Sequence, residues 1–354
     1  MKTILVTGGA GFIGSNFIHY VLGNYSEYKV INLDLLTYAG NLENLKDLAG
    51  HGNYRFIQGD ISCSDSLKAI FRANPIDYVV NFAAETHVDR SIREPEIFVR
   101  TNVLGTANLL NVARKYWANR DGSYGKNKFI QISTDEVYGS LGAEGLFTEN
   151  TPYDPHSPYS ASKAGADLLA HSFYATYGFP VIITRCGNNY GPYQFPEKLI
   201  PLMINNALQK KPLPVYGDGL QIRDWLYVED HCAAITLVLQ KGKAGTVYNI
   251  GGCNEKTNLQ VVKTIINYLQ KHVDPMITAD LIKHVADRKG HDRRYGIDPT
   301  KIQKELGWSA QTAFHTGIER TIRWYLEHQE WLENVTSGEY QSYYQKVYGR
   351  LDKS

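Results

Sequence analysis

The stretch Ile4-Leu5-Val6-Thr7-Gly8-Gly9-Ala10-Gly11-Phe12-Ile13-Gly14 decides the fold. A short apolar run ends in glycines at 8, 11 and 14, and a helical pattern follows at once. Small residues let the backbone approach a pyrophosphate closely, and a helix N-terminus adds free N–H groups and a positive dipole end. The stretch therefore predicts a strand–turn–helix unit that binds a dinucleotide, although a purely structural turn uses the same glycines.

Asp34 supplies the second part of this pattern, because it closes the next apolar run twenty residues after Gly14. A carboxylate at this spacing accepts both ribose hydroxyls of an adenosine and repels a 2′-phosphate. We therefore expect NAD rather than NADP. The alternative interpretation, a surface aspartate beside a structural turn, is the weaker one in this context.

Short apolar runs alternate with helical patterns over the first half of the chain, which predicts an α/β fold of the Rossmann-like, doubly wound parallel type. The expected helices are Phe12–Leu22, Asp65–Asn74, Glu96–Trp117 and Ser160–Tyr177. The expected strands are Thr3–Thr7, Lys29–Leu33, Tyr54–Gln58, Tyr78–Phe82, Lys128–Ser133 and Val181–Arg185.

From about Gly187 the pattern becomes irregular and rich in Pro, Asn and Tyr, with short strands at Leu213–Tyr216, Gln221–Tyr227 and Val247–Ile250. We expect an NAD-binding domain over residues 1–186 that carries the catalytic residues. Residues 187–354 then form a smaller, mixed α/β substrate-binding region, partly interleaved with the first and lying over the carboxyl edge of the sheet.

Composition excludes several classes of partner. The net charge is +1 and 21% of the residues are charged, so the basic surplus typical of nucleic-acid or anionic-membrane binding is missing. The four cysteines are far apart and form no C-x-x-C pair, which fits a reducing, cytoplasmic setting. The sequence also shows no cluster with metal-ligand spacing, and we expect no metal site and no membrane span.

Two further segments extend the expected cofactor site. Asp60 and Ile61 follow the third strand and could flank the adenine. Phe82, Ala83 and Ala84 end the fourth strand and leave a gap of small residues where the middle of the cofactor could pass. Both assignments depend on the glycine motif.

Tyr159 and Lys163 form a Y-x-x-x-K pair within a helical pattern that Ser157 can cap, with Pro158 in the first turn. A separation of four residues places both side chains on one helix face. We expect the ammonium to lower the pKa of the phenol, so that the pair removes a proton from a sugar hydroxyl while hydride leaves for NAD. The motif alone is a common accident, but it follows a dinucleotide motif here.

The sharper signal is Ser133-Thr134-Asp135-Glu136-Val137-Tyr138-Gly139 at the end of the fifth expected strand. Oxidation of an alcohol needs only the Tyr/Lys pair and a hydroxyl donor such as Thr134. Two adjacent acids suit a second proton transfer, for example the removal of water. The alternative for either acid alone is a helix cap or a bond to a loop amide.

These motifs resemble the dTDP-glucose 4,6-dehydratase family over nearly the whole chain. The glycine and Y-x-x-x-K motifs belong to the extended short-chain dehydrogenase/reductases in general, whereas the Asp135-Glu136 pair discriminates. Related 4-epimerases have small or hydroxyl residues there, and sugar-nucleotide decarboxylases a single acid. Similar stretches begin at Ala83 (A-A-E-T-H-V-D), Asn188 (N-N-Y-G-P), Pro196 (P-E-K-L-I-P), Arg223 (R-D-W-L-Y-V-E-D) and Gly290 (G-H-D-R-R-Y).

The resemblance implies three steps at one site. Tyr159, aided by Thr134 and Lys163, takes the proton of the carbon-4 hydroxyl as NAD receives the hydride. Glu136 then removes the carbon-5 proton while Asp135 protonates the departing carbon-6 hydroxyl. Hydride returns to carbon 6 and a proton is restored at carbon 5, so the product is a 4-keto-6-deoxy sugar nucleotide and no NAD is consumed.

The resemblance also implies further contacts. Thr37 and Thr101 would join the cofactor site, and Thr86 and His87 would approach the sugar, although a packed histidine is the plainer interpretation of His87. Arg223 suits a diphosphate, with a salt bridge to Asp224 as the alternative. The residues expected around the nucleotide are Asn188, Lys198, Leu199, Val215, Tyr216, Arg223, Asn258 and His291.

Related enzymes pair two helices per subunit into a four-helix interface, so the resemblance implies a homodimer through Glu96–Trp117 and the Tyr159 helix. The tail Trp331–Gly349, with Tyr340, Tyr343, Tyr344 and Tyr348, is expected to pack as a terminal segment. The remaining alternatives are a UDP-sugar 4-epimerase or decarboxylase and a non-catalytic NAD-sensing protein. The family likeness favours dTDP over UDP as the nucleotide.

Overall fold

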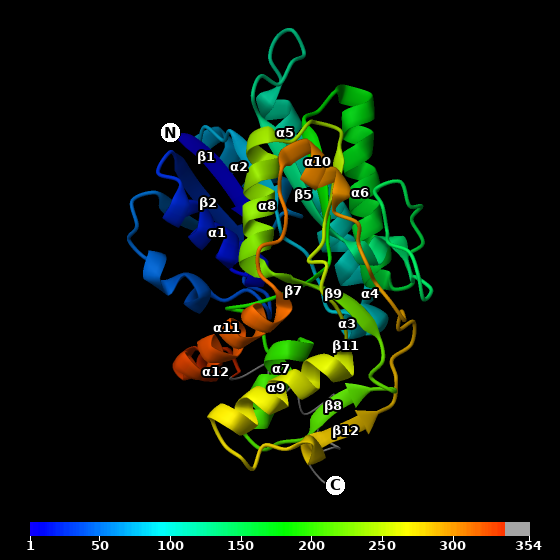
Figure 1. Ribbon diagram of the computed structural model, residues 1–354. Coiled ribbons are helices and arrows are strands. Elements are labelled where there is room, and N and C mark those ends of the chain that lie inside the picture. Colours follow the sequence, from blue (N-terminus) through cyan, green and yellow to red (C-terminus); the bar gives the residue numbers. More distant parts are fainter. Residues whose placement is uncertain (337–354) are drawn as a thin grey trace.

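A seven-stranded sheet forms the centre of the computed structural model, which describes residues 1–336 (Figure 1). The strand order is β10-β6-β5-β4-β1-β2-β3, and every neighbouring pair is parallel. The order reverses between β1 and β4, the point at which doubly wound sheets bind ligands. The strands are β1 (Lys2–Thr7), β2 (Tyr28–Asp34), β3 (Tyr54–Gln58), β4 (Tyr78–Asn81), β5 (Lys128–Thr134), β6 (Val181–Cys186) and β10 (Val247–Ile250).

Both faces of this sheet are buried, because successive side chains of a strand point to opposite faces. Ile4 and Val6 of β1 pack in one apolar cluster with α1 and α8, whereas Leu5 packs in another with α2, α5 and α6. A strand buried on both sides reads as a continuous apolar run, as β1 does. The covering helices are α1 (Phe12–Asn24), α2 (Ser64–Ala73), α5 (Thr106–Trp117), α6 (Pro158–Tyr177) and α8 (Val228–Lys241).

A smaller lobe lies below the carboxyl ends of the strands in Figure 1 and has its own apolar core. It contains a three-stranded sheet, β11-β9-β7, and a two-stranded sheet, β12-β8. Its strands are β7 (Asn188–Tyr190), β8 (Leu213–Tyr216), β9 (Ile222–Tyr227), β11 (Glu255–Thr257) and β12 (Ile282–Val285). The helices around it are α7 (Leu199–Leu208), α9 (Asn258–His272), α11 (Phe314–Glu327) and α12 (Gln329–Val335).

The remaining short elements connect these parts. Helices α3 and α4 and the segment η2 follow β4 and lead into α5. Each of η1, η3 and η4 is a short 3-10 helix, and α10 precedes α11. Their bounds are η1 (Leu42–Leu48), α3 (Val88–Arg93), α4 (Pro95–Phe98), η2 (Val99–Gly105), η3 (Asp135–Tyr138), η4 (Ala279–Leu281) and α10 (Thr300–Leu306).

The doubly wound fold class is confirmed, and all nine expected strands appear, with ends within one residue of the prediction. Two details differ. The single helix expected over Glu96–Trp117 contains the π-helical segment η2, whose bonding pattern side-chain periodicity does not reveal. Strand β10 returns from the second region to the edge of the main sheet, so the two regions interleave there. The boundary at residue 186 stays a prediction.

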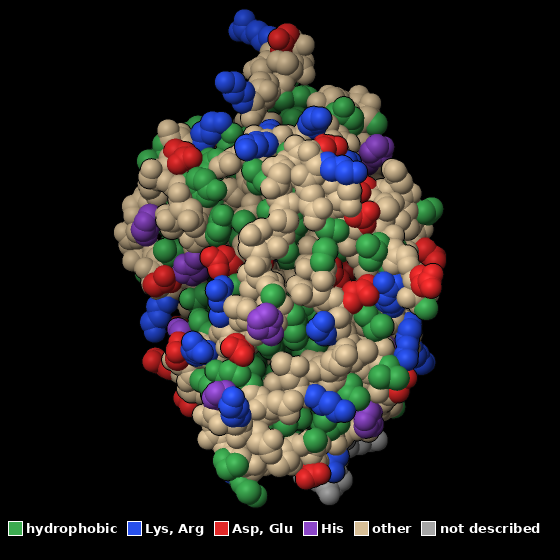
Figure 2. All heavy atoms as spheres, viewed as in Figure 1, with side chains coloured by type: hydrophobic (Ala, Val, Ile, Leu, Met, Phe, Trp, Pro, Cys, Tyr) green, Lys and Arg blue, Asp and Glu red, His purple; other side chains and the backbone are tan. Residues whose placement is uncertain are grey.

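The surface agrees with the balanced composition. On the face shown in Figure 2, Lys and Arg side chains lie interspersed with Asp and Glu. Within residues 1–336 no helix is long and apolar enough to cross a membrane, and no three metal-ligating side chains are grouped. Trp331 packs in the core of the second lobe, whereas Tyr340, Tyr343, Tyr344 and Tyr348 lie outside the described residues.

Candidate active site

The turn after β1 allows no larger residue at two of its glycines. Gly8 has a φ of +70°, and a Cβ there would lie 2.5 Å from the Ala83 backbone nitrogen. A Cβ on Gly14 would lie 2.3 Å from the Gly8 carbonyl oxygen. Gly11 precedes α1 without a side-chain cap, so the first N–H groups of this helix face the cavity unblocked. This backbone cradle fits the pyrophosphate of a dinucleotide.

Asp34 is fixed at the end of β2 by two backbone groups. Its Oδ2 accepts the Ala10 N–H at 2.9 Å and its Oδ1 accepts the Leu36 N–H at 2.8 Å. Burial raises the pKa of this carboxyl, while the same two N–H groups oppose that rise. The aspartate lines the cavity beside the glycine turn, as the ribose of an adenosine requires.

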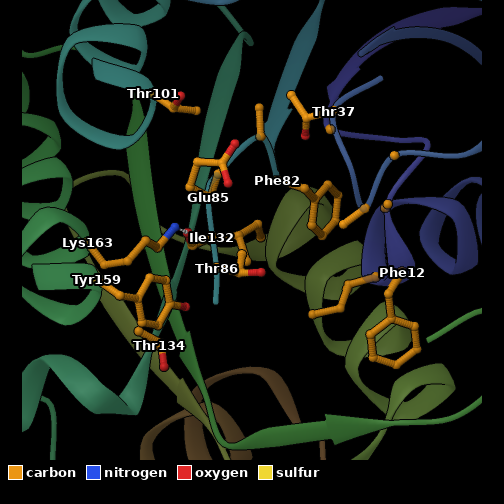
Figure 3. Close-up of a pocket in the computed structure, with 18 of the residues that line it drawn as sticks. Phe12, Thr37, Phe82, Glu85, Thr86, Thr101, Ile132, Thr134, Tyr159 and Lys163 are labelled. Carbon is orange, nitrogen blue, oxygen red and sulfur yellow. Dashed lines mark hydrogen bonds between the residues drawn. The ribbon is translucent and has the colours of Figure 1, made fainter. Parts of the chain in front are cut away.

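One cavity of about 550 Å³ joins the cofactor motif to the catalytic motifs. Figure 3 shows Phe12, Thr37 and Phe82 on one side of it and Tyr159, Lys163 and Thr134 on the other. All the predicted cofactor residues line it. They are Gly8, Gly11, Phe12, Ile13, Gly14, Asp34, Thr37, Asp60, Ile61, Phe82, Ala83, Ala84, Thr101, Tyr159 and Lys163.

Helix α6 places Tyr159 and Lys163 in the cavity wall. Ser157 caps the helix in a reciprocal capping box with Ser160, and Pro158 occupies the first turn, as expected. The Lys163 Nζ donates to the Ile132 carbonyl of β5 at 2.6 Å, which fixes the ammonium between helix and sheet.

The expected lowering of the Tyr159 pKa is wrong for the protein alone. Burial raises this pKa well above its usual value, and the charge of Glu136 adds to the rise. Tyr159 packs in a small apolar cluster with Val88 and Phe98, away from water. Spacing along a helix predicts which face a phenol shares, but not how deeply tertiary packing buries it.

Asp135 and Glu136 form the first turn of η3, directly after β5, and both line the cavity. Burial raises the pKa of Asp135 well above its usual range, and the Glu136 charge raises it further. Burial also raises the pKa of Glu136, but nearby Arg288, Arg223 and Lys198 oppose the rise. The pKa of Asp135 is therefore raised further than that of Glu136, which favours Asp135 as the acid of the pair and Glu136 as the base.

The predicted substrate residues divide into two groups. Thr86, Thr134, Asn188 and Lys198 line the same cavity as the catalytic pair. The Lys198 Nζ donates to the Thr86 carbonyl at 3.1 Å, so the two segments meet at the cavity wall.

Other predicted substrate residues are not part of this wall. His87 is buried, its Nδ1 accepts the Arg90 N–H and caps α3, and its Nε2 lies 3.9 Å from Glu197. Val215 is 1% exposed within the core of the second lobe, so its side chain is not available to a ligand. Leu199 begins α7 and packs against that core, and Asn258 begins α9.

Arg223 and His291, two further predicted substrate residues, lie near the carboxylate pair, since the charge of Arg223 acts on both Glu136 and His291. The Arg223 guanidinium stacks on Tyr295 and donates to the Asp292 carbonyl at 3.0 Å. It makes no ion pair with Asp224, whose oxygens accept backbone N–H groups instead. The His291 Nδ1 bonds Asp287 at 2.5 Å, and its ring lies edge-on to Tyr216.

Sequence reasoning missed Arg288, two residues before the G-H-D-R-R-Y motif. Its Nε is buried without a hydrogen-bond partner within the described chain, and its charge acts on Glu136, Arg223 and His291. An unpaired buried guanidinium nitrogen is costly unless a ligand bonds it. The signal in the sequence was an arginine beside a motif that already held basic residues.

One cavity thus combines the glycine turn and Asp34 with the Tyr159/Lys163 pair and two adjacent carboxylates. This combination is typical of an extended short-chain dehydrogenase/reductase that modifies nucleotide sugars. Residues 5–321 match the family described as GDP-mannose 4,6 dehydratase. The dTDP-glucose 4,6-dehydratase of Salmonella typhimurium is 52% identical, with 98% of each chain covered. That of Xanthomonas campestris is also 52% identical, over 96% of this chain and 97% of the relative. The chain belongs to the dTDP-glucose 4,6-dehydratase family.

Solved structures agree with this family. The dTDP-glucose 4,6-dehydratase of Bacillus anthracis in complex with NAD is 51% identical and superimposes with a TM-score of 0.85, covering 95% of this chain and 100% of that one. The Streptomyces venezuelae enzyme, also with NAD, is 46% identical with a TM-score of 0.88, covering 94% of this chain and 100% of that one. A UDP-glucose 4-epimerase of Thermotoga maritima shares the fold at 30% identity, with a TM-score of 0.82, and covers 93% of this chain and 100% of that one.

Proposed function

We propose that this protein removes water from dTDP-glucose and forms dTDP-4-keto-6-deoxyglucose, an NAD-dependent hydro-lyase reaction of deoxysugar biosynthesis. The observation that carries the proposal is the Asp135-Glu136 pair, placed beside Tyr159 in the cavity that also holds the dinucleotide cradle. Oxidation at carbon 4 uses Tyr159, whereas water loss from carbons 5 and 6 needs one more acid and one more base.

The chain supplies each proton transfer from a separate group. Tyr159 must act as a phenolate, so the proposal requires that the positive charges of Lys163 and of bound NAD offset the rise in its pKa; the phenolate then accepts the carbon-4 hydroxyl proton. Glu136 takes the carbon-5 proton, which the neighbouring ketone makes acidic. Asp135, protonated because it is buried, gives its proton to the departing carbon-6 hydroxyl. NAD, when bound, would accept the carbon-4 hydride and deliver it to carbon 6. Glu136 returns its proton to carbon 5 at that stage, and proton exchange with solvent resets Tyr159 and Asp135.

The diphosphate would lie among the cations at the edge of the cavity. Lys198, Arg223 and Arg288 all act on Glu136, so they surround the same space from three segments. Planar guanidinium groups donate paired, charge-assisted bonds to phosphate oxygens. Asn188 and His291 complete this proposed site, and the preference for dTDP over UDP follows the family.

A homodimer and a cytoplasmic location are part of the proposal. Val99 and Leu104 of η2 and Leu168 of α6 are each more than half exposed, and η2 packs against α6. Apolar side chains gathered on adjoining helices favour burial against a second subunit. The four cysteines are free thiols, as a reducing compartment would keep them.

Mass spectrometry of the products tests the reaction. The purified protein is incubated with dTDP-glucose and no added reductant, and we expect a loss of one water with the nucleotide intact. A parallel incubation with UDP-glucose shows which of the two nucleotides the protein prefers in its substrate. Conversion to the galactose isomer at unchanged mass indicates an epimerase instead, and tight NAD binding without turnover of any sugar nucleotide indicates the NAD-sensing alternative.

A further inference from the structure

One buried ion pair has no part in the chemistry above. The Arg185 Nε of β6 lies 2.9 Å from the Asp167 Oδ2 of α6, with side chains 3% and 0% exposed. Two charges lose much of their hydration on burial, and a pair of this kind often contributes little net stability. Asp167 belongs to the same helix as Tyr159 and Lys163, which suggests that the pair has a role other than stability.

Asp167 lies one helical turn beyond Lys163, so the two side chains share the face of α6 that meets the sheet. Both are buried, and the Lys163 ammonium is already fixed by its bond to the Ile132 carbonyl. Tyr159 lies one turn before Lys163 on the same face. Along this face, the Tyr159 phenol is followed by the Lys163 ammonium and then by the Asp167 carboxylate. The Arg185 guanidinium of β6 pairs with that carboxylate.

Electrostatics agrees with this geometry. Burial lowers the pKa of Lys163, and the Asp167 charge is the strongest influence that raises it, followed by Cys186 of β6. Burial raises the pKa of the Cys186 thiol to about 12, so this group is neutral at working pH. Burial raises the pKa of Asp167 as well, and the charge of Arg185 opposes that rise.

Arg185 also reaches the turn that carries the acid–base pair. Its Nη1 donates to the Tyr138 hydroxyl at 2.8 Å, and its Nη2 donates to the Tyr153 hydroxyl. Tyr138 ends η3, three residues after Asp135, and its hydroxyl donates to Asn249 of β10 at 2.8 Å. One guanidinium thus ties α6, η3 and two neighbouring strands together behind the active site.

We propose that Asp167 is a positioning residue, held by Arg185, that keeps the Lys163 ammonium charged and in place for the Tyr159 step. The inference rests on the proposed function, because it assumes that Tyr159 acts with Lys163. Three alternating charges run from β6 through α6 to the phenol. Removal of the middle charge affects the protonation of Lys163 rather than substrate binding.

The first test is the pH profile of kcat for Asp167→Asn. Without the carboxylate, Lys163 loses its proton at lower pH, and the alkaline limb moves down by about one pH unit or more. KM for dTDP-glucose stays close to the wild-type value, because no contact with the substrate is removed. Asp167→Glu keeps the charge, and its profile remains near that of the wild type.

A second variant separates charge from folding. Asp167→Asn leaves Arg185 buried and unpaired, so it can reduce stability on its own. The double variant Asp167→Leu, Arg185→Met replaces the ion pair with apolar groups of similar size. It also removes the bonds of Arg185 to Tyr138 and Tyr153, so its melting temperature is measured beside its pH profile. We expect the alkaline limb to stay shifted in it, whereas a merely structural pair predicts a return to the wild-type profile.

The matched control is Glu255→Gln, which breaks the Arg294–Glu255 pair (2.7 Å) in the second lobe. It should lower the melting temperature and leave the pH profile unchanged. A shift of equal size in this variant overturns the proposal, since any broken ion pair would then produce it.

A readout without turnover keeps the inference apart from the proposed function. NMR of the Nζ group in the NAD-bound, ¹⁵N-lysine-labelled protein over a pH series, with the Lys163 signal assigned by its loss in Lys163→Arg, gives the pKa of Lys163 directly. We expect a lower value in Asp167→Asn than in the wild type, and equal values overturn the inference. Absence of water loss in the wild type would contradict the proposed reaction instead.

Discussion

The two halves of the cavity are built from different materials. The cofactor half consists mainly of backbone, with glycines at two positions that exclude a side chain and an Asp34 fixed by two N–H groups. The half in which we propose catalysis has charged side chains, with Asp135 and Glu136 in the cavity wall and the charge of Arg288 acting on Glu136. The first half depends on shape and close approach, and the second on protonation and charge.

This difference suits the two halves to different tasks, cofactor binding in one and proton transfer in the other. A cofactor that returns unchanged needs a fixed cradle, and backbone N–H groups need no reorganisation. Proton transfers need groups whose pKa values are moved apart, which only side chains in different surroundings can provide. A substitution in one half should therefore leave the other half unaffected.

The largest effect is expected for Asp135→Asn. The amide cannot give a proton to the departing hydroxyl, so water loss should slow by about a hundredfold to ten-thousandfold. NAD affinity should remain unchanged, because Asp135 lies in the other half of the cavity. Stopped-flow absorbance of NADH measures the step that precedes water loss, and product mass measures water loss itself.

Glu144→Gln is the control for Asp135→Asn, because it removes an exposed carboxylate from the loop that follows η3. It should leave both rates near wild type. Failure of Asp135→Asn to bind NAD would show that the two halves are not independent and that the role of Asp135 is assigned wrongly.

The next effect is expected for Gly8→Ala in the cofactor half. A Cβ there meets the Ala83 backbone at 2.5 Å in a left-handed conformation, so the turn must shift. A displacement that costs about 1.4 kcal/mol of binding free energy weakens NAD about tenfold. Isothermal titration calorimetry with NAD measures this loss.

Gly50→Ala provides the matched control. Gly50 has a similar φ of +85° but no atom within 4 Å of its would-be Cβ. Strain alone should cost about 1–2 kcal/mol of stability there, with NAD affinity retained. Equal NAD affinity in the two variants would mean that strain, and not close approach, explains the glycine at position 8.

The same contrast explains what could be predicted from the sequence. The cofactor half follows from local spacing, since the glycine turn and the end of β2 lie close together along the chain. All its predicted residues do line the cavity. The alternation of β1 to β6 with helices likewise predicted the sheet, because strands buried on both faces are continuously apolar.

The substrate half is assembled from segments that are distant in sequence, and prediction was weaker there. Val215 belongs to the expected strand, but its side chain packs in the core of the second lobe. The alternation of side chains along a strand does not reveal which face is buried, so the sequence could not predict this. Arg288 escaped notice because a lone arginine has no spacing to mark it. Its unpaired Nε is a property of tertiary packing alone.

A smaller effect, confined to the diphosphate side, is expected for Arg288→Met. Loss of a charge-assisted bond worth about 1.5–3 kcal/mol raises KM for dTDP-glucose about tenfold to a hundredfold. NAD affinity should not change. Steady-state kinetics measures KM, and Lys289→Met, an exposed neighbour, should leave it unaltered. A loss of NAD affinity in Arg288→Met would place this arginine in the cofactor half.

The smallest effect concerns pH and His156, which joins the start of α6 to the segment that carries Arg288. Its Nδ1 bonds Asp292 at 2.6 Å, its Nε2 lies 3.3 Å from Asp154, and Tyr295 donates to the other Asp292 oxygen. The hydrogen bond to Asp292 raises the pKa of His156 above its unfolded value. The stabilisation is therefore complete below a pH of about 6.5 and is lost as pH rises through the folded pKa.

Because the His156 side chain is 40% exposed, its contribution should stay below about 1 kcal/mol. Urea unfolding at about pH 6 and about pH 9 should show this loss in the wild type and not in His156→Gln. His315→Gln, an exposed histidine of α11, should behave like the wild type. NAD affinity should be the same in His156→Gln and the wild type, because His156 is not among the residues that line the cavity. A pH dependence that persists in His156→Gln would assign the titration to another group and weaken the contrast between the two halves.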